Sequence, residues 1–204
     1  MTSIRIKTLD RLTHEDLARL VDGYVSDSVY RVKKTDDGNR IAIHLRRTRI
    51  RPPYTKVFPH PAGELRKYGE VVKQGWSLGA YDGTELVGLA LAEPRHWNRS
   101  VWVWEIGVAP SHRRRGIGRR LIAGLARRAR KAGLRVLVCE TQTTNVPAID
   151  FYRKVGFVME GVDFSYYSNE DLEKGEVAIF MKLRVPASRP SGRSGTGARR
   201  RTSE

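Results

Sequence analysis

One stretch near the middle of the chain, Val101 to Arg120, constrains the fold more than any other. Strand-forming residues from Val101 to Val108 lead through Ala109-Pro110 into three consecutive arginines and a Gly-Ile-Gly. Apolar residues then recur at helical spacing, at Ile117, Leu121, Ile122, Leu125 and Ala129. This order predicts a strand, a basic glycine-rich turn and the beginning of a helix.

A turn of this composition is suited to binding an anion. The first N–H groups of a helix have no partner inside the helix, and the helix dipole adds partial positive charge there. Gly116 and Gly118 allow a ligand to approach the backbone closely. Arg113, Arg114 and Arg115 offer planar hydrogen-bond donors. We interpret the turn as a binding site for a pyrophosphate.

The short motif is also compatible with other sites. A nucleotide-triphosphate loop is excluded because no Gly-Lys-Ser/Thr follows the glycines. A dinucleotide site gains from Glu140, an acid about 20 residues further on at the end of the next strand. However, Leu121 stands at the third position of the glycine fingerprint, and six residues separate the strand from the first glycine. A basic turn that only caps a surface helix is the remaining alternative.

The chain after this helix adds a second pattern. Residues Arg135 to Glu140 read as a strand, and a further helix follows. Asn145 is typical of a helix N-cap, Pro147 of a first helical turn, and Gly156 of the residue that ends a helix.

Together the two patterns resemble the GCN5-related N-acetyltransferase (GNAT) superfamily, which binds acetyl-CoA. The matching motifs are Arg-x-x-Gly-x-Gly at Arg113 to Gly118 and Asn-x-x-Ala-x-x-Phe-Tyr-x-x-x-Gly-Phe at Asn145 to Phe157. Within the superfamily, residues 140–142, 145–152, 167–169 and 176–180 look most like streptothricin acetyltransferases. The resemblance extends from about Trp97 to Leu183 and is weak before that.

The resemblance implies an α/β (α+β) fold with a central mixed, mostly antiparallel sheet flanked by helices. Two strands of that sheet should splay into a V that holds acetyl-CoA. The implied activity is acetyl-CoA-dependent transfer of an acetyl group to a primary amine. Backbone groups of Ile106, Gly107 and Val108 should hold the pantetheine arm and polarise the carbonyl. The other implied cofactor contacts are Arg113, Arg114, Arg115, Gly116, Ile117, Gly118, Arg119, Asn145 and Tyr152.

Two residues are the expected proton handlers. A phenol is protonated at neutral pH, so Tyr152 suits protonation of the CoA sulfur, unless it only packs beside the cofactor. Glu105 is an acid on a strand with apolar neighbours, which is costly unless it meets water, a partner or a substrate. It would take the proton from the acceptor ammonium, or else pair with an arginine. Trp104 stands where the streptothricin enzymes have the first acid of a Glu-Asp pair.

Strict alternation along this strand predicts two faces. One face would carry Trp102, Trp104, Ile106 and Val108, and the other Val103, Glu105 and Gly107. We expect a bulge at Gly107, since glycine in a strand often marks one.

Acidic and aromatic residues predict the acceptor pocket. Glu105 and Glu140 come from the two strands beside the cofactor, and Asp163, Tyr166 and Tyr167 lie in the segment that follows Phe157. Carboxylates and ring faces both attract an ammonium group. The expected acceptor is the β-lysine amine of streptothricin, with a peptide or protein amine as the alternative.

The length and composition predict one domain. A chain of 204 residues with 40% apolar residues suffices for one well-buried domain. We expect it over residues 1–185, followed by a disordered basic tail over residues 186–204. With no apolar run of membrane length and no leader-like start, the protein is expected in the cytoplasm. The oligomeric state is open, a homodimer included.

The net charge of +16 raises the question of nucleic acids. Ten basic residues and no acidic one lie between Ser111 and Arg135, and nine basic against two acidic between Arg31 and Lys56. Because aromatic and basic residues do not interleave, we expect nucleic acid to bind only loosely, through the tail. A basic nucleic-acid-associated module with a degenerate CoA site, and a CoA-binding protein without turnover, are the alternative functions.

No metal site is expected, because the five histidines are scattered and Cys139 is the only cysteine. We expect Cys139 to be a small core residue. The remaining patterns predict a strand at Ile4–Lys7, a capping box at Thr13–Asp16 with a helix to about Val21, hairpin arms at Val29–Lys34 and Arg40–Arg49, an irregular bridge at Pro52–Thr55 and Phe58–Pro61, paired strands at Gly75–Tyr81 and Glu85–Leu91, a strand over Val158–Met159 and Asp163–Ser168, a loop at Asn169–Gly175 and a last strand at Glu176–Arg184.

Overall fold

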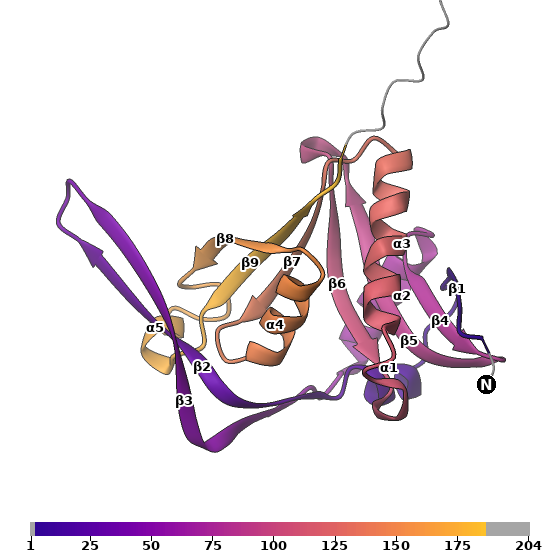
Figure 1. Cartoon of the computed structure of the whole chain (residues 1–204), viewed down its shortest axis with the longest axis horizontal. Coiled ribbons are helices and arrows are strands. Elements are labelled where there is room, and N and C mark those ends of the chain that lie inside the picture. Colours follow the sequence, from indigo (N-terminus) through magenta and orange to yellow (C-terminus); the bar gives the residue numbers. More distant parts are fainter. Residues whose placement is uncertain (1–2, 187–204) are drawn as a thin grey trace, which may run out of the picture.

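The computed structural model describes residues 3–186, so the predicted tail beyond Pro186 lies outside the described residues. Its centre is a seven-stranded sheet in the order β1-β4-β5-β6-β7-β9-β8, in which only β6 and β7 are parallel (Figure 1). The strands are β1 (Arg5–Thr8), β4 (Leu78–Asp82), β5 (Glu85–Arg95), β6 (Ser100–Val108), β7 (Val136–Gln142), β8 (Val158–Asp163) and β9 (Ala178–Arg184). This confirms the predicted mixed, mostly antiparallel sheet.

Helices cover both faces of the sheet. On one face lie α3 (Ile117–Lys131) and α4 (Val146–Lys154), and on the other α1 (His14–Leu20) and α2 (Ala62–Lys73). Strand β5 contributes to both cores, since Val87, Ala90 and Ala92 join the core under α3, while Leu86, Leu89 and Leu91 join the core under α1 and α2. Its alternation is interrupted once, at Val87, which is an extra residue in the pairing with β4. We call the two faces of the sheet the α3 face and the α2 face.

Strand β6 does not alternate as predicted, because it contains a bulge at Trp104. Leu91 pairs with Glu105 and Ala92 with Val103, which leaves Trp104 as the extra residue. Val103 and Ile106 therefore both face α3, whereas Trp104 and Glu105 both face α2. The predicted bulge at Gly107 is wrong, since Gly107 pairs regularly with Leu89.

Strands β6 and β7 separate after a short parallel pairing. Their register runs from Ser100 with Val136 to Val103 with Cys139 and stops there. Beyond that point, Glu105 to Val108 and Glu140 to Gln142 diverge as the two arms of a V (Figure 1). The predicted splay is thereby confirmed.

A second, two-stranded sheet is formed by β2 (Gly23–Asp36) and β3 (Ile41–Val57). This hairpin crosses from α1 to α4 and continues past the short helix α5 (Asp171–Lys174) (Figure 1). The hairpin was predicted but is longer than expected, since β3 includes the stretch predicted as an irregular bridge from Pro52 to Thr55. Pairing is interrupted between Ser26 and Ser28, opposite the two prolines that cannot donate a backbone hydrogen bond.

Most other elements lie where local sequence signals predicted them. The capping box at Thr13 and Asp16 begins α1, and Asn145 caps α4 with Pro147 in its first turn. The strand predicted over Asp163–Ser168 is wrong, because β8 ends at Asp163 and a turn follows. Helix α5 occupies part of the predicted loop. No helix among the described residues is long and apolar enough to cross a membrane.

Candidate active site

The glycine-rich turn forms an open helix N-terminus at one mouth of the splay. Gly116 precedes α3 in the left-handed region, at φ 76°, and Arg114 also has a positive φ of 67°. No side chain caps the helix, and the first helical N–H that bonds back along the helix is that of Arg120, to the Gly116 carbonyl. The N–H groups of Ile117, Gly118 and Arg119 are therefore available to an anion.

The four arginines of the turn differ in their surroundings. Arg113 donates to the Val108 carbonyl at 3.0 Å and forms an ion pair with Asp22 at 3.1 Å. Within residues 3–186, Arg114, Arg115 and Arg119 form no hydrogen bond or ion pair, so their guanidinium groups are free for a ligand. Arg113 thus ties the turn to the end of α1, while the other three supply unpaired charge.

The two glycines of the turn have different functions. Gly116 supplies a backbone conformation that other residues rarely adopt. A Cβ atom at Gly118 would lie 2.9 Å from the ring of Phe151 on α4. The absence of a side chain at Gly118 is therefore needed for the packing of α3 against α4, in addition to any approach by a phosphate.

The backbone of β6 offers unpaired groups to the splay. Ala109 donates its N–H to Val87 on β5 at 2.9 Å. Backbone groups of an antiparallel strand alternate in direction, so the groups of Ile106 and the N–H of Val108 point toward the side from which β7 has diverged. A pantetheine arm needs such donors and acceptors. Gly107 serves a different purpose, because a Cβ there would lie 2.1 Å from the Leu20 carbonyl.

Tyr152 lies on the α3 face, below the point where the strands part. Only 5% of its surface is exposed, and its ring packs against Phe151 and Phe157 at centroid distances of 5.4 and 5.2 Å. Its hydroxyl lies beside the Cys139 thiol. Burial, followed by the nearby Cys139 and Glu105, raises the pKa of Tyr152 well above its usual value. The phenol is therefore a proton donor across the neutral range.

Glu105 lies on the α2 face and is partly buried. Its Oε1 accepts a hydrogen bond of 2.7 Å from the hydroxyl of Tyr68 on α2, and it forms no ion pair with any arginine among residues 3–186. Removal from water raises the pKa of Glu105 to about 7, the Tyr68 hydrogen bond opposes this, and Glu64 reinforces it. A carboxylate with this pKa can accept a proton near neutral pH.

Glu140 lies on the other arm of the V and also has a tyrosine partner. The Tyr167 hydroxyl donates to its Oε1. Burial raises the pKa of Glu140 to about 7, although the Tyr167 hydrogen bond and the charge of Lys56 lower it. Lys56 forms its own ion pair with Glu176.

The proposed acid and base lie on opposite faces of the sheet. Tyr152 belongs to the same core as Cys139, Ile106 and the inner residues of α3. Glu140 alternates with Cys139 and pairs with Phe180, so it shares the α2 face with Glu105. A cofactor on the α3 face and an acceptor on the α2 face would therefore meet at the splay.

An aromatic wall lines the α2 face next to the two carboxylates. The ring centre of Phe180 lies 6.0 Å from that of Trp102 and 5.5 Å from that of Tyr166, and the ring centres of Tyr166 and Tyr167 are 5.2 Å apart. Cationic side chains cover the tryptophans, with Lys67 at 3.7 Å from the Trp104 ring and Arg95 at 4.0 Å from the Trp102 ring. Asp163 accepts from the Ser165 N–H at 3.0 Å. Burial raises the pKa of Tyr166, and the charges of Glu140 and Asp163 raise it further.

Sequence reasoning missed the contribution of α2. No helix was predicted for residues 62–74, yet Leu65, Tyr68 and Val72 recur at helical spacing and pack inward. That period could have placed Tyr68 on the inner face. His60 and Glu64 form a pair at 2.8 Å beside it, and nothing in the sequence connects them with Glu105.

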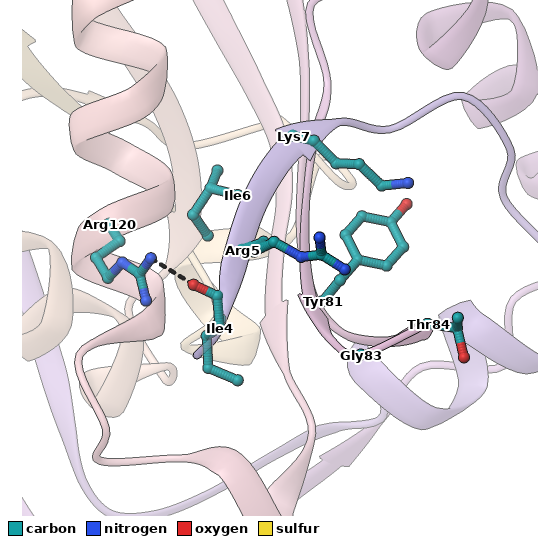
Figure 2. A pocket seen from close by; sticks show the side chains of 8 residues that line it. All are labelled: Ile4, Arg5, Ile6, Lys7, Tyr81, Gly83, Thr84 and Arg120. Carbon is teal, nitrogen blue, oxygen red and sulfur yellow. Dashed lines mark hydrogen bonds between the residues drawn. The ribbon is translucent and has the colours of Figure 1, made fainter. Parts of the chain in front are cut away.

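A hollow of about 570 Å³ lies elsewhere on the surface. Figure 2 shows it at the β1 edge, lined by Arg5, Lys7, Tyr81, Thr84 and Arg120 among others. Strands β4 and β5 separate this edge from β6, so the hollow is not part of the splay. Residues 3–186 contain no group of three or more His, Cys, Asp or Glu side chains arranged as metal ligands.

Two diverging parallel strands beside an uncapped helix N-terminus define the class of CoA-dependent acyltransferases. Residues 34–157 match the model of the Acetyltransferase (GNAT) family. The chain is 34% identical to a streptothricin acetyltransferase of Streptomyces lavendulae, over 84% of this chain and 90% of that one. It therefore belongs to the GNAT family, and it is an acetyl-CoA-dependent N-acetyltransferase.

Solved structures agree with this assignment. A crystal structure of nourseothricin acetyltransferase has 32% identity and a TM-score of 0.69, covering 91% of this chain and all of that one. A Bacillus anthracis structure, described as a putative streptothricin acetyltransferase in complex with acetyl coenzyme A, has 26% identity and a TM-score of 0.66. It covers 89% of this chain and 99% of that one. Both structural matches extend over the N-terminal half of the chain, where the sequence motifs are weak.

Proposed function

We propose that the enzyme transfers the acetyl group of acetyl-CoA to an amine of streptothricin. The observation that carries the proposal is the placement of Glu105 and Tyr152 on opposite faces of the sheet, at the splay. Two partly buried carboxylates on the α2 face would attract a cationic acceptor on a chain that is otherwise strongly basic. Similarity to the Streptomyces relative along nearly its whole length supports the acceptor.

The α3 face would bind the cofactor through backbone and arginine side chains. The free N–H groups of Ile117, Gly118 and Arg119 and the guanidinium groups of Arg114, Arg115 and Arg119 would hold the pyrophosphate. Unpaired backbone groups of Ile106 and Val108 would hold the pantetheine arm. Arg113, bonded to Val108 and Asp22, would keep the turn in place, and Asn145 would fix α4 through its cap. Acetyl-CoA supplies an activated acyl group when bound.

Proton transfer would use one residue from each face. Glu105, ionised above its pKa of about 7, would accept the proton of the acceptor ammonium, directly or through water. Tyr152 would donate its phenolic proton to the departing sulfur, because its raised pKa keeps the phenol protonated. Tyr68 would orient the Glu105 carboxylate through the 2.7 Å hydrogen bond.

A competition assay tests the acceptor. The enzyme is given acetyl-CoA with streptothricin and a set of peptides at matched concentrations, and the products are identified by mass spectrometry. We expect acetyl-streptothricin as the main product. A modified peptide without acetyl-streptothricin would replace the antibiotic with a peptide amine and leave the enzyme class unchanged.

The assembly and the location of the enzyme stay predictions. The expected location is the cytoplasm, and the oligomeric state is open, a homodimer included. Sedimentation of the purified chain tests the oligomeric state, and fractionation of cells that express it tests the location.

A further inference from the structure

Glu105 and Glu140 share an arrangement that no other carboxylate at the splay has. Each is partly buried, and each accepts a hydrogen bond at Oε1 from a tyrosine hydroxyl, Tyr68 and Tyr167 respectively. Neither forms an ion pair with any described residue, although the chain has 38 lysines and arginines. Both lie on the α2 face, on opposite arms of the V.

The neighbouring carboxylates are already paired. Glu176 has Lys56 as its cationic partner and also accepts from the Tyr54 hydroxyl at 2.8 Å. Glu64 contacts the His60 ring at 2.8 Å. Within residues 3–186, Glu105 and Glu140 are therefore the carboxylates of this group that have neither an ion-pair partner nor a histidine partner, and a cation would stabilise a partly desolvated carboxylate of this kind.

One reacting amine accounts for only one of these carboxylates. Glu105 lies next to Ile106, whose backbone faces the splay, so it is the carboxylate adjacent to the expected acyl group. Glu140 lies across the V, and the proton transfer assigned to Glu105 does not use it. Glu140 forms no ion pair among residues 3–186, and the nearby Lys56 ammonium is paired with Glu176, so Glu140 can match a second positive charge on the acceptor.

We propose that Glu140 determines specificity by binding a second ammonium group of the acceptor, which makes diamines the preferred acceptor class. This inference rests on the proposed function. The surroundings of Glu140 suit an ammonium. The rings of Tyr166 and Tyr167 meet edge to face beside it, and the Lys56 ammonium lies 5.8 Å from the centre of the Tyr167 ring. A cation of the protein thus already rests near one of these rings.

A matched pair of small amides tests the assignment without the antibiotic. The first, 3,6-diaminohexanamide, has the two amines of a β-lysine, and the second, 3-aminohexanamide, lacks the distal one. We expect the wild-type kcat/KM to favour the diamine by about 10- to 100-fold, as for a charge-assisted hydrogen bond. Glu140→Gln should bring this ratio to about 1, because kcat/KM for the diamine falls much more than kcat/KM for the monoamine.

Control variants separate this effect from a general loss of function. Glu160→Gln removes a carboxylate on β8 that pairs with Lys182 and Arg184, and should leave the ratio unchanged. Glu140→Asp keeps a carboxylate and should keep part of the preference for the diamine, so it replaces Glu140→Gln if that variant fails to fold. A thermal melt and acetyl-CoA affinity establish that each variant is intact.

The outcomes distinguish this assignment from the proposed function. A wild-type enzyme that prefers the diamine but does not acetylate streptothricin would overturn the proposed acceptor and support the role of Glu140. A wild-type ratio near 1, an unchanged ratio in Glu140→Gln, or no turnover of either amide would overturn the role of Glu140, whether or not streptothricin is acetylated.

Discussion

The two faces of the sheet are built from different parts of the chain and by different means. On the α3 face, backbone groups and glycines from one continuous stretch, Ile106 to Arg119, form the proposed cofactor site. On the α2 face, the proposed acceptor site is assembled from side chains of distant segments, including Tyr68 from α2 and Tyr167 from the turn after β8. The cofactor is common to a superfamily, whereas the acceptor varies. Binding the constant ligand with backbone leaves side chains on the other face free to change.

This difference predicts how each face responds to substitution. A change on the α3 face should alter cofactor binding or the chemical step with every acceptor. A change on the α2 face should alter the pH dependence or the choice of acceptor while the cofactor still binds. Four substitutions examine this comparison, beginning with the largest expected effect.

Tyr152→Phe removes the proposed proton donor and keeps the ring that packs between Phe151 and Phe157. We expect kcat to fall by about 100-fold or more, the usual contribution of a positioned acid, with little change in acetyl-CoA affinity. Steady-state kinetics and calorimetry measure the two quantities. Tyr81→Phe, at the far edge of the sheet, is the matched control. Wild-type turnover in the Tyr152 variant would remove the residue from the chemical step.

Glu105→Gln removes the proposed base from the α2 face. Because the pKa of Glu105 is about 7 and the ionised form accepts the proton, the wild-type rate should rise with pH through about 7. The variant should lose this rise and about 50-fold in kcat/KM above it. Glu140→Gln should keep the rise, although its pKa is also about 7. A rise that disappears only in the Glu140 variant would exchange the two roles.

Arg115→Gln tests whether the unpaired arginines of the turn bind the cofactor. Loss of one charge-assisted contact should raise KM for acetyl-CoA by about 10-fold and leave kcat nearly unchanged. Arg130→Gln, on the exposed side of the same helix, should have no such effect. Equal KM values for the two variants would mean that the turn attracts the cofactor only through its total charge.

Tyr68→Phe should have the smallest effect and the most specific one. The Tyr68 hydrogen bond lowers the pKa of Glu105, so its loss should raise that pKa and move the rise in activity to higher pH. At pH 7 the rate should fall by a few fold, and at high pH it should recover. Tyr54→Phe, which removes a hydroxyl from Glu176, should leave the profile in place. A uniform loss at all pH values would point to a packing role for Tyr68.

The proposed cofactor side of the site was easier to predict from the sequence than the proposed acceptor side. The cofactor turn and the Asn145 cap follow from local signals, because helix termini and glycine-rich turns depend on neighbouring residues, whereas the splay was implied by the family resemblance. The bulge at Trp104 and the hydrogen bond between Tyr68 and Glu105 depend on tertiary register. A single extra residue in β6 reversed the facing of the Glu105, Ile106 and Val108 side chains, and no local pattern marked it. Helix α2 was missed because the prolines before it suggested a bridge and its period was not followed.

The same division applies to the acidic residues of the acceptor site. Glu105 was identified because an acid among apolar strand neighbours is unusual in itself, and Glu140 because it lies on the other strand beside the cofactor. Lys56, Tyr54 and Glu176 were not, because each is ordinary on a solvent-exposed hairpin or loop, and only the tertiary structure brings the hairpin to Glu176. Asp163 was chosen by resemblance alone.

The splay also has a consequence for the motion of the free enzyme. Ile106 and Val108 lie in the centre of a seven-stranded sheet, yet their backbone groups on one side have no strand to bond. In the free protein these amide protons should exchange with water rapidly, between neighbours that exchange slowly because β5 protects them. A bound cofactor would form hydrogen bonds with these backbone groups, in the place where a neighbouring strand is absent, and would slow the exchange of the amide protons. The cohesion between the two halves of the domain then depends on how much acetyl-CoA the cell holds.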